Sequence, residues 1–234
     1  MQEAIFRKMP QQYLVVGTLF LILGIWVRHL AQADGGTSAA ADFFHASHGT
    51  LMVFFGIIPI FFVAVGYGLV PSVGTTAWPF LDRFALVVFY ISAGAVVITL
   101  RVRSHGLFDF ALGLNFLFGI AAAAGFIVRS LLIQNSCGKK GLHATSIGFL
   151  GLSVWIIITY TLLEFAAIMQ LTSTWLAGGP PIYYEAASND ASVPLIWRHL
   201  FWFLGHPEVV VFFTLIGGLI ADGLRNLLWR RASV

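Results

Sequence analysis

The chain reads WRHLFWFLGHPEV from Trp197 to Val209 and continues as an apolar run from Val210 to Ile220. A histidine, a proline and a carboxylic acid, His206, Pro207 and Glu208, therefore stand within sequence that is hydrophobic enough for a bilayer. Ionisable groups at that depth cost several kcal/mol, so they are functional candidates. The proline removes a backbone donor and kinks the helix, which re-aims the imidazole.

The composition places the whole chain in a membrane. Hydrophobic residues make up 59% of the chain and charged residues 10%, against about 25% charged in a soluble domain. A helix needs about 20 apolar residues to cross the hydrocarbon core. We predict an all-α, polytopic membrane bundle of six transmembrane helices, with residues 1–234 as one membrane domain. The predicted windows are 11–33, 43–71, 80–101, 108–134, 144–176 and 194–229.

The Lys and Arg residues predict the orientation of this bundle. Six spans put both termini on one side. If that side is inner, nine of the thirteen Lys and Arg residues face inside, as the positive-inside rule requires. The four predicted to face outside are Arg28, Arg101, Arg103 and Arg198. The net charge of +3 then reflects topology and contact with the lipid bilayer, and no nucleic-acid partner is expected.

A histidine also opens the second predicted span, in the sequence HASHGTLMVFF from His45 to Phe55. The neutral imidazole of His48 can ligate haem iron, and the surrounding Phe, Met and small residues suit a haem edge. The alternative is an interfacial histidine that caps the helix or bonds a carbonyl. The single cysteine, Cys137, excludes an internal disulfide and a cysteine-based metal site.

Both histidine segments resemble the catalytic subunit I of the haem-copper oxidases, the cytochrome c and quinol oxidases. The segment ending in His206 resembles its sixth helix, with the pattern W-x-x-G-H-P-E-V-Y. The segment from His48 to Pro71 resembles its second helix, with H-x-x-x-M-x-F-F followed by G-x-x-x-V-P. The similarity covers nearly the whole chain and implies the first six helices of that subunit, its N-terminal half.

The resemblance implies roles for individual residues. It makes His48 an axial ligand of the low-spin haem iron, His206 a copper ligand and Trp202 a neighbour of that copper. Arg28, in the sequence VRHLAQ, is similar to an arginine of the family that contacts the low-spin haem. Such a cation at the haem rim would raise its reduction potential. Alternatively, Arg28 is a snorkelling arginine at the membrane interface.

Two acids lie within predicted spans. The apolar helix favours the neutral form of Glu208, which can pass protons along a chain of water molecules; this is the role that the family implies. The alternative is a neutral acid that bonds a neighbouring helix. Glu164, in the fifth span, matches no role in the family.

The sequence also departs from the family pattern. Val210 stands where the family has a tyrosine that supplies an electron and a proton, and Thr75 stands where it has an aspartate at the inner mouth of a proton path. Asp82 falls near a family asparagine, as a displaced proton-entry group or a solvated loop acid. The remaining metal ligands of the family come from helices that would follow Val234. One ligand per metal holds neither centre, so we expect no activity from the isolated chain.

Three functional hypotheses follow. In the first, the chain is half of the oxygen-reducing subunit of a terminal oxidase in an inner membrane. A partner chain with the missing helices then completes the haem and copper sites, and cytochrome c or quinol supplies electrons. In the second, it is a non-catalytic structural paralogue within a larger respiratory or copper-dependent membrane complex. In the third, it is a transporter or quinone-binding bundle that reuses the scaffold.

Overall fold

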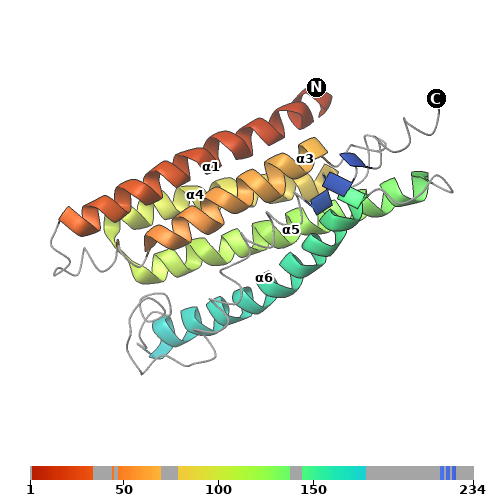
Figure 1. Ribbon diagram of the computed structural model, residues 1–234. Helices are drawn as coiled ribbons and strands as arrows, with labels where there is room; N and C mark the ends of the chain where they lie inside the picture. The colour runs from red at the N-terminus through yellow and green to blue at the C-terminus, as the bar shows by residue number, and fades with distance from the viewer. Residues whose placement is uncertain are drawn as a thin grey trace.

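The computed structural model describes residues 2–33, 44, 47–69, 79–137 and 144–177, and a few positions between 217 and 224. Every element in these ranges is helical, which confirms the all-α class (Figure 1). The elements are α1 (Gln2–Ala33), η1 (Leu51–Ala64), α3 (Val65–Leu69), α4 (Pro79–Val102), α5 (His105–Cys137) and α6 (Ala144–Ala177).

Five helices of the described part are long and apolar enough to cross a membrane, and they match the first five predicted windows. The sixth window, 194–229, lies outside the described residues except for a few helical positions. Six spans and inner-side termini therefore remain predictions. The five candidate spans are Met9–Ala33, Ser47–Tyr67, Phe80–Val102, Gly106–Leu132 and Ile147–Phe165.

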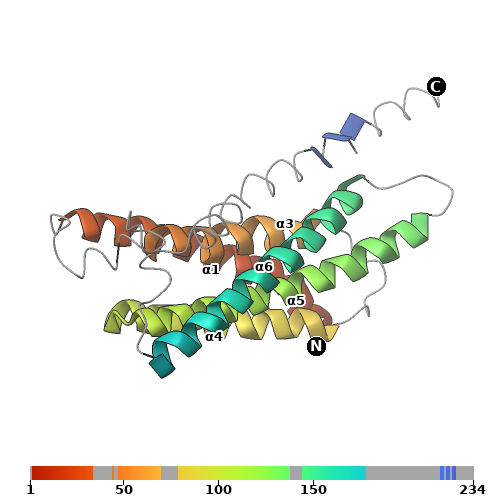
Figure 2. The ribbon, with the colours of Figure 1, turned by 90° about the horizontal axis from the view of Figure 1, so that it is seen from below.

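Helices that are neighbours in sequence pack together in alternating directions. The main contacts join α1 to η1, α4 to α5 and α5 to α6, and α6 lies obliquely across α5 (Figure 2). This alternation brings the segments of Arg28 and Arg101 to one end of the bundle and those of Arg83 and Arg129 toward the other. The described cations are thus divided between the two ends of the bundle.

The helix η1 is the most enclosed element of the described bundle. Ten of its fourteen residues are buried. It is a π-helix, and where it ends the N–H of Val65 donates to the carbonyl oxygen of Ile60, five residues earlier. Pro59, which has no N–H to donate, lies inside it. Long π-helices are rare, and nothing in the apolar pattern of this span predicts one.

Glycines allow α1 and η1 to approach closely. A Cβ atom at Gly17 would lie 2.6 Å from Cγ1 of Ile60 and 3.0 Å from the carbonyl oxygen of Gly56. A Cβ at Gly56 would lie 2.5 Å from Cδ2 of Leu21. Small residues at such contacts are how helices associate in lipid, where no hydrophobic effect drives them together. The Gly17–Gly56 contact therefore sets the spacing of the two helices.

Aromatic rings connect this pair to the other helices. The ring of Tyr13 on α1 lies 5.3 Å from that of Phe89 on α4, between ring centroids. Phe89 in turn lies 4.8 Å from Phe118 on α5. On the other side of η1, Phe54 lies 5.3 Å from Phe116 of α5. The core therefore contains a layer of aromatic rings that joins α1 to α4 and α5, and η1 to α5.

We predict that Gly17→Ala destabilises the protein by about 1–3 kcal/mol, because the added methyl group overpacks the α1–η1 contact. The matched control is Gly94→Ala on α4, where a Cβ meets nothing within 4 Å. This control should be neutral or stabilising by up to about 1 kcal/mol, since alanine favours helix. Unfolding in mixed micelles measures both, and equal stabilities would contradict the close contact.

Candidate functional site

The predicted haem-binding end contains His48 and Arg28. His48 is half-buried in the helical turn just before η1, and Arg28 is exposed near the end of α1. A Cβ at Gly24 would lie 3.2 Å from the carbonyl oxygen of His48. Because Arg28 follows Gly24 by one helical turn, α1 brings Arg28 to the end of the bundle where His48 lies. An exposed guanidinium agrees with both interpretations of Arg28.

Arg103 belongs to the same end of the bundle. It has a left-handed backbone, with φ of 56°, and its N–H donates to the carbonyl oxygen of Thr99 at 2.7 Å. This geometry ends α4 and turns the chain into α5. The Arg103 guanidinium carbon lies 5.5 Å from the ring centroid of Phe44, just before the His48 turn.

The described residues form no complete metal centre. In the ranges that the structure describes, no three His, Cys, Asp or Glu side chains lie close enough to hold a metal ion. His48 has the donor chemistry of one axial ligand, and a haem iron of this type needs two. Trp202, His206 and Glu208 lie outside the described residues.

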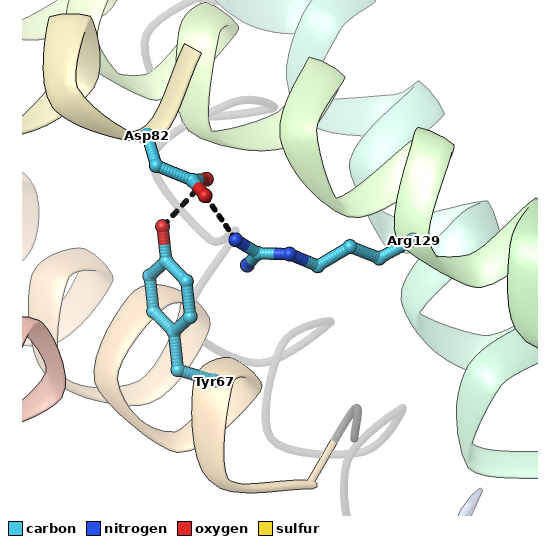
Figure 3. A network of polar contacts seen from close by, with 3 residues as sticks. All are labelled: Tyr67, Asp82 and Arg129. Atoms are coloured by element: carbon cyan, nitrogen blue, oxygen red, sulfur yellow. Dashed lines mark hydrogen bonds and ion pairs between the residues drawn. The ribbon is translucent and has the colours of Figure 1, made fainter. Parts of the chain in front are cut away.

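A polar network at the opposite end of the bundle joins three helices (Figure 3). The hydroxyl of Tyr67 on α3 donates to Oδ1 of Asp82 on α4 at 2.7 Å. The guanidinium of Arg129 on α5 donates to Oδ2 of the same carboxylate and forms an ion pair with it. Each oxygen of the carboxylate is therefore bonded by a different helix.

The surroundings of this network are closely packed. Asp82 is 3% exposed, and a Cβ at Gly125 would lie 3.1 Å from its Oδ1. The Arg129 guanidinium carbon lies 4.3 Å from the ring centroid of Tyr67 and 5.6 Å from that of Phe126. A buried charge persists where it is paired and hydrogen-bonded. The structure thus excludes the interpretation of Asp82 as a solvated loop acid.

Sequence reasoning missed Tyr67 and Arg129 as partners of Asp82. The available signal was an arginine inside an apolar stretch, which requires a counter-charge on a neighbouring helix. Asn115 is fully buried on α5. Neither polar atom of its amide has a hydrogen-bond partner in the structure.

Comparison with known proteins decides the family. The family model described as cytochrome c and quinol oxidase polypeptide I matches residues 8–231. The chain belongs to this family. It is that of the haem-copper oxidases, whose full enzymes contain haem and copper and work as multisubunit membrane complexes. The resemblance of the histidine segments to subunit I is thereby confirmed.

Its relatives in the oxidase family are distant and longer. The chain is 25% identical over 196 residues to cytochrome c oxidase subunit 1 of Plasmodium berghei, covering 74% of this chain and 41% of the relative. It is 24% identical over 252 residues to the subunit of Alkalihalophilus pseudofirmus, covering 92% and 39%. The Bacillus subtilis subunit is 24% identical over 254 residues, with the same coverage. The chain spans about two fifths of the length of these relatives.

We predict that Asp82→Ala destabilises this oxidase-family chain by about 3–5 kcal/mol, because it leaves the Arg129 guanidinium buried without a counter-charge. Tyr67→Phe removes one hydrogen bond and should cost about 1 kcal/mol. Combining Asp82→Ala with Arg129→Met should recover part of the loss, since no charge is then stranded. Unfolding in mixed micelles measures all three. Equal losses for Asp82→Ala and Tyr67→Phe would contradict a stabilising ion pair.

Proposed function

We propose that the chain forms part of the oxygen-reducing subunit of a haem-copper terminal oxidase in an inner membrane. Membership of the oxidase family carries this proposal. The placement of His48 and Arg28 at one end of the α1–η1 pair supports it further. A ligand and a haem-rim cation need to be at the same membrane depth, and these two residues come from different helices.

Each proposed residue has a limited task. His48 holds the low-spin haem iron from one side, and Arg28 lies at the haem rim. His206 ligates copper, with Trp202 beside it, and Glu208 passes protons toward the oxygen site. When bound, haem and copper supply the electron transfer to oxygen. Each centre needs further ligands beside these residues, and cytochrome c or quinol is the electron donor.

Two residues favour an alternative function. Val210 can supply neither the electron nor the proton that the family's tyrosine provides, and Thr75 carries no carboxyl group for proton uptake. In this alternative, the chain is a non-catalytic structural paralogue packed within a larger respiratory or copper-dependent complex. The two functions differ in whether His48 and His206 hold metals.

We expect His48→Ala to abolish the low-spin haem signal of the complex purified through this chain in mild detergent, because the iron loses an axial ligand. His206→Ala should abolish bound copper and leave that haem signal in place. Redox difference spectroscopy and metal analysis measure the two losses. The matched control is His29→Ala, an exposed histidine beside Arg28, which should change neither.

The same experiment decides between the two functions. If haem and copper contents are unchanged in His48→Ala and His206→Ala, the chain is the structural paralogue. If haem is lost only in His48→Ala and copper only in His206→Ala, the oxidase proposal holds.

We further predict that Arg28→Gln lowers the reduction potential of the low-spin haem. A fixed positive charge near the haem stabilises its reduced form, and the substitution removes that charge. Arg28→Lys, which keeps the charge, should retain most of the potential. Potentiometric titration of the complex measures the shift. If Arg28 only snorkels to the interface, both variants keep the wild-type potential, and the haem-rim role is wrong.

A further inference from the structure

Asp109 is a buried acid for which the proposed function has no use. It lies on α5 and is 1% exposed. Neither of its carboxyl oxygens has a hydrogen-bond partner in the structure. An ionised carboxyl group without a partner is energetically unfavourable inside a membrane bundle. We therefore expect the Asp109 carboxyl to bind something other than a protein group.

A second acid reaches the same face of α5 from α6. A Cβ at Gly113 would lie 3.6 Å from both carboxyl oxygens of Glu164, and Oε2 of Glu164 is buried without a partner. Gly113 follows Asp109 by four residues, so both lie on one face of α5. Asp109 therefore lies one helical turn along α5 from the position that faces the Glu164 carboxyl group.

A third unpaired polar group lies in this interface. Tyr160 precedes Glu164 by one turn of α6 and is 1% exposed, and its hydroxyl has no hydrogen-bond partner. Its ring packs 5.2 Å from Phe116 of α5 and 5.9 Å from Phe54 of η1, between centroids.

Among the side chains that the structure describes, the two acids have no counter-charge. No charged side chain among the described residues acts on either carboxyl group. The other titratable or charged residues on the elements packed against α5 and α6 are His48 in the turn before η1, Asp82, Arg83, Tyr90 and Arg101 on α4, His105, Arg129 and Cys137 on α5, and Tyr160 on α6. This is the opposite of Asp82, whose carboxylate is bonded to Arg129.

We propose that Asp109 and Glu164 form an internal proton-exchange site at the α5–α6 interface, reached by bound water. Each carboxyl group takes one proton from water, carries it as the neutral acid and returns it, and no electron moves on either residue. Bound water supplies the hydrogen bonds that the protein leaves unmade. Neither acid has a role in the proposed function.

The first test is infrared spectroscopy of the complex purified through this chain, in H₂O and D₂O. We expect carbonyl bands of protonated carboxylic acids that shift on deuteration, one lost in Asp109→Asn and one in Glu164→Gln. Glu164→Asp should retain a displaced band. The measurement uses the resting complex, so it gives an answer whether or not the proposed haem and copper roles hold.

A variant that keeps both acids tests whether water reaches the Glu164 carboxyl beside Gly113. Gly113→Ala places a methyl group in ordinary contact with the Glu164 carboxyl and displaces water there, so the Glu164 band should shift and exchange its proton more slowly. Gly94→Ala, where a Cβ meets nothing within 4 Å, should leave the band unchanged. Equal spectra for these two glycine variants would contradict water access beside Glu164.

A second measurement uses the wild-type complex, so it does not depend on whether a variant folds. A hydrophobic carbodiimide reacts with protonated carboxyl groups in apolar surroundings, and mass spectrometry of the labelled wild-type complex should find Glu164 modified. The proposal is wrong if Glu164 stays unlabelled and no protonated band belongs to either acid. It is equally wrong if a zero-length cross-linker joins Glu164 to a basic residue of another subunit, which would make it half of an ion pair.

Discussion

Helices within a bilayer gain nothing from the hydrophobic effect by leaving lipid for one another, and this constraint governs the structure. Their backbone groups are satisfied inside each helix, so association depends on contacts that lipid cannot provide. The described bundle has three kinds of such contacts. They are the close approach at Gly17 and Gly56, the layer of aromatic rings through Phe89 and Phe118, and the ion pair of Asp82 with Arg129.

These contacts hold opposite ends of the bundle. The ion pair and the Tyr67 hydrogen bond join α3, α4 and α5 at one end. The glycines join α1 to η1, and through Gly24 they bring the Arg28 end of α1 to the turn that carries His48. The proposed haem ligand is therefore positioned by backbone packing. Such positioning suits a ligand whose depth in the membrane has to stay fixed while a cofactor and a partner chain assemble around it.

The helices were predictable from sequence because a run of apolar residues in lipid has few alternatives to a helix. The candidate ligands His48 and His206 could be named from sequence because their motifs are local, and their roles stay predictions. The Asp82 network was not, because its members are separated by 15 and 47 positions and hydropathy carries no information on which helices meet. Aligning Asp82 with a family asparagine suggested a solvated loop acid as one option, and burial against Arg129 excludes it. The π-helical form of η1 likewise depends on tertiary packing.

The acids of the bundle show two solutions to the same electrostatic problem. Asp82 is paired, because an arginine and a tyrosine bond both of its oxygens. Asp109 and Glu164 leave three buried oxygens unbonded, in a bundle whose other helices are able to provide such partners. An unpaired buried charge costs several kcal/mol, and replacement by an apolar residue would remove that cost. A carboxyl group that has no structural partner is instead suited to binding and releasing a proton, which the fixed ion pair of Asp82 cannot do without breaking a contact between helices.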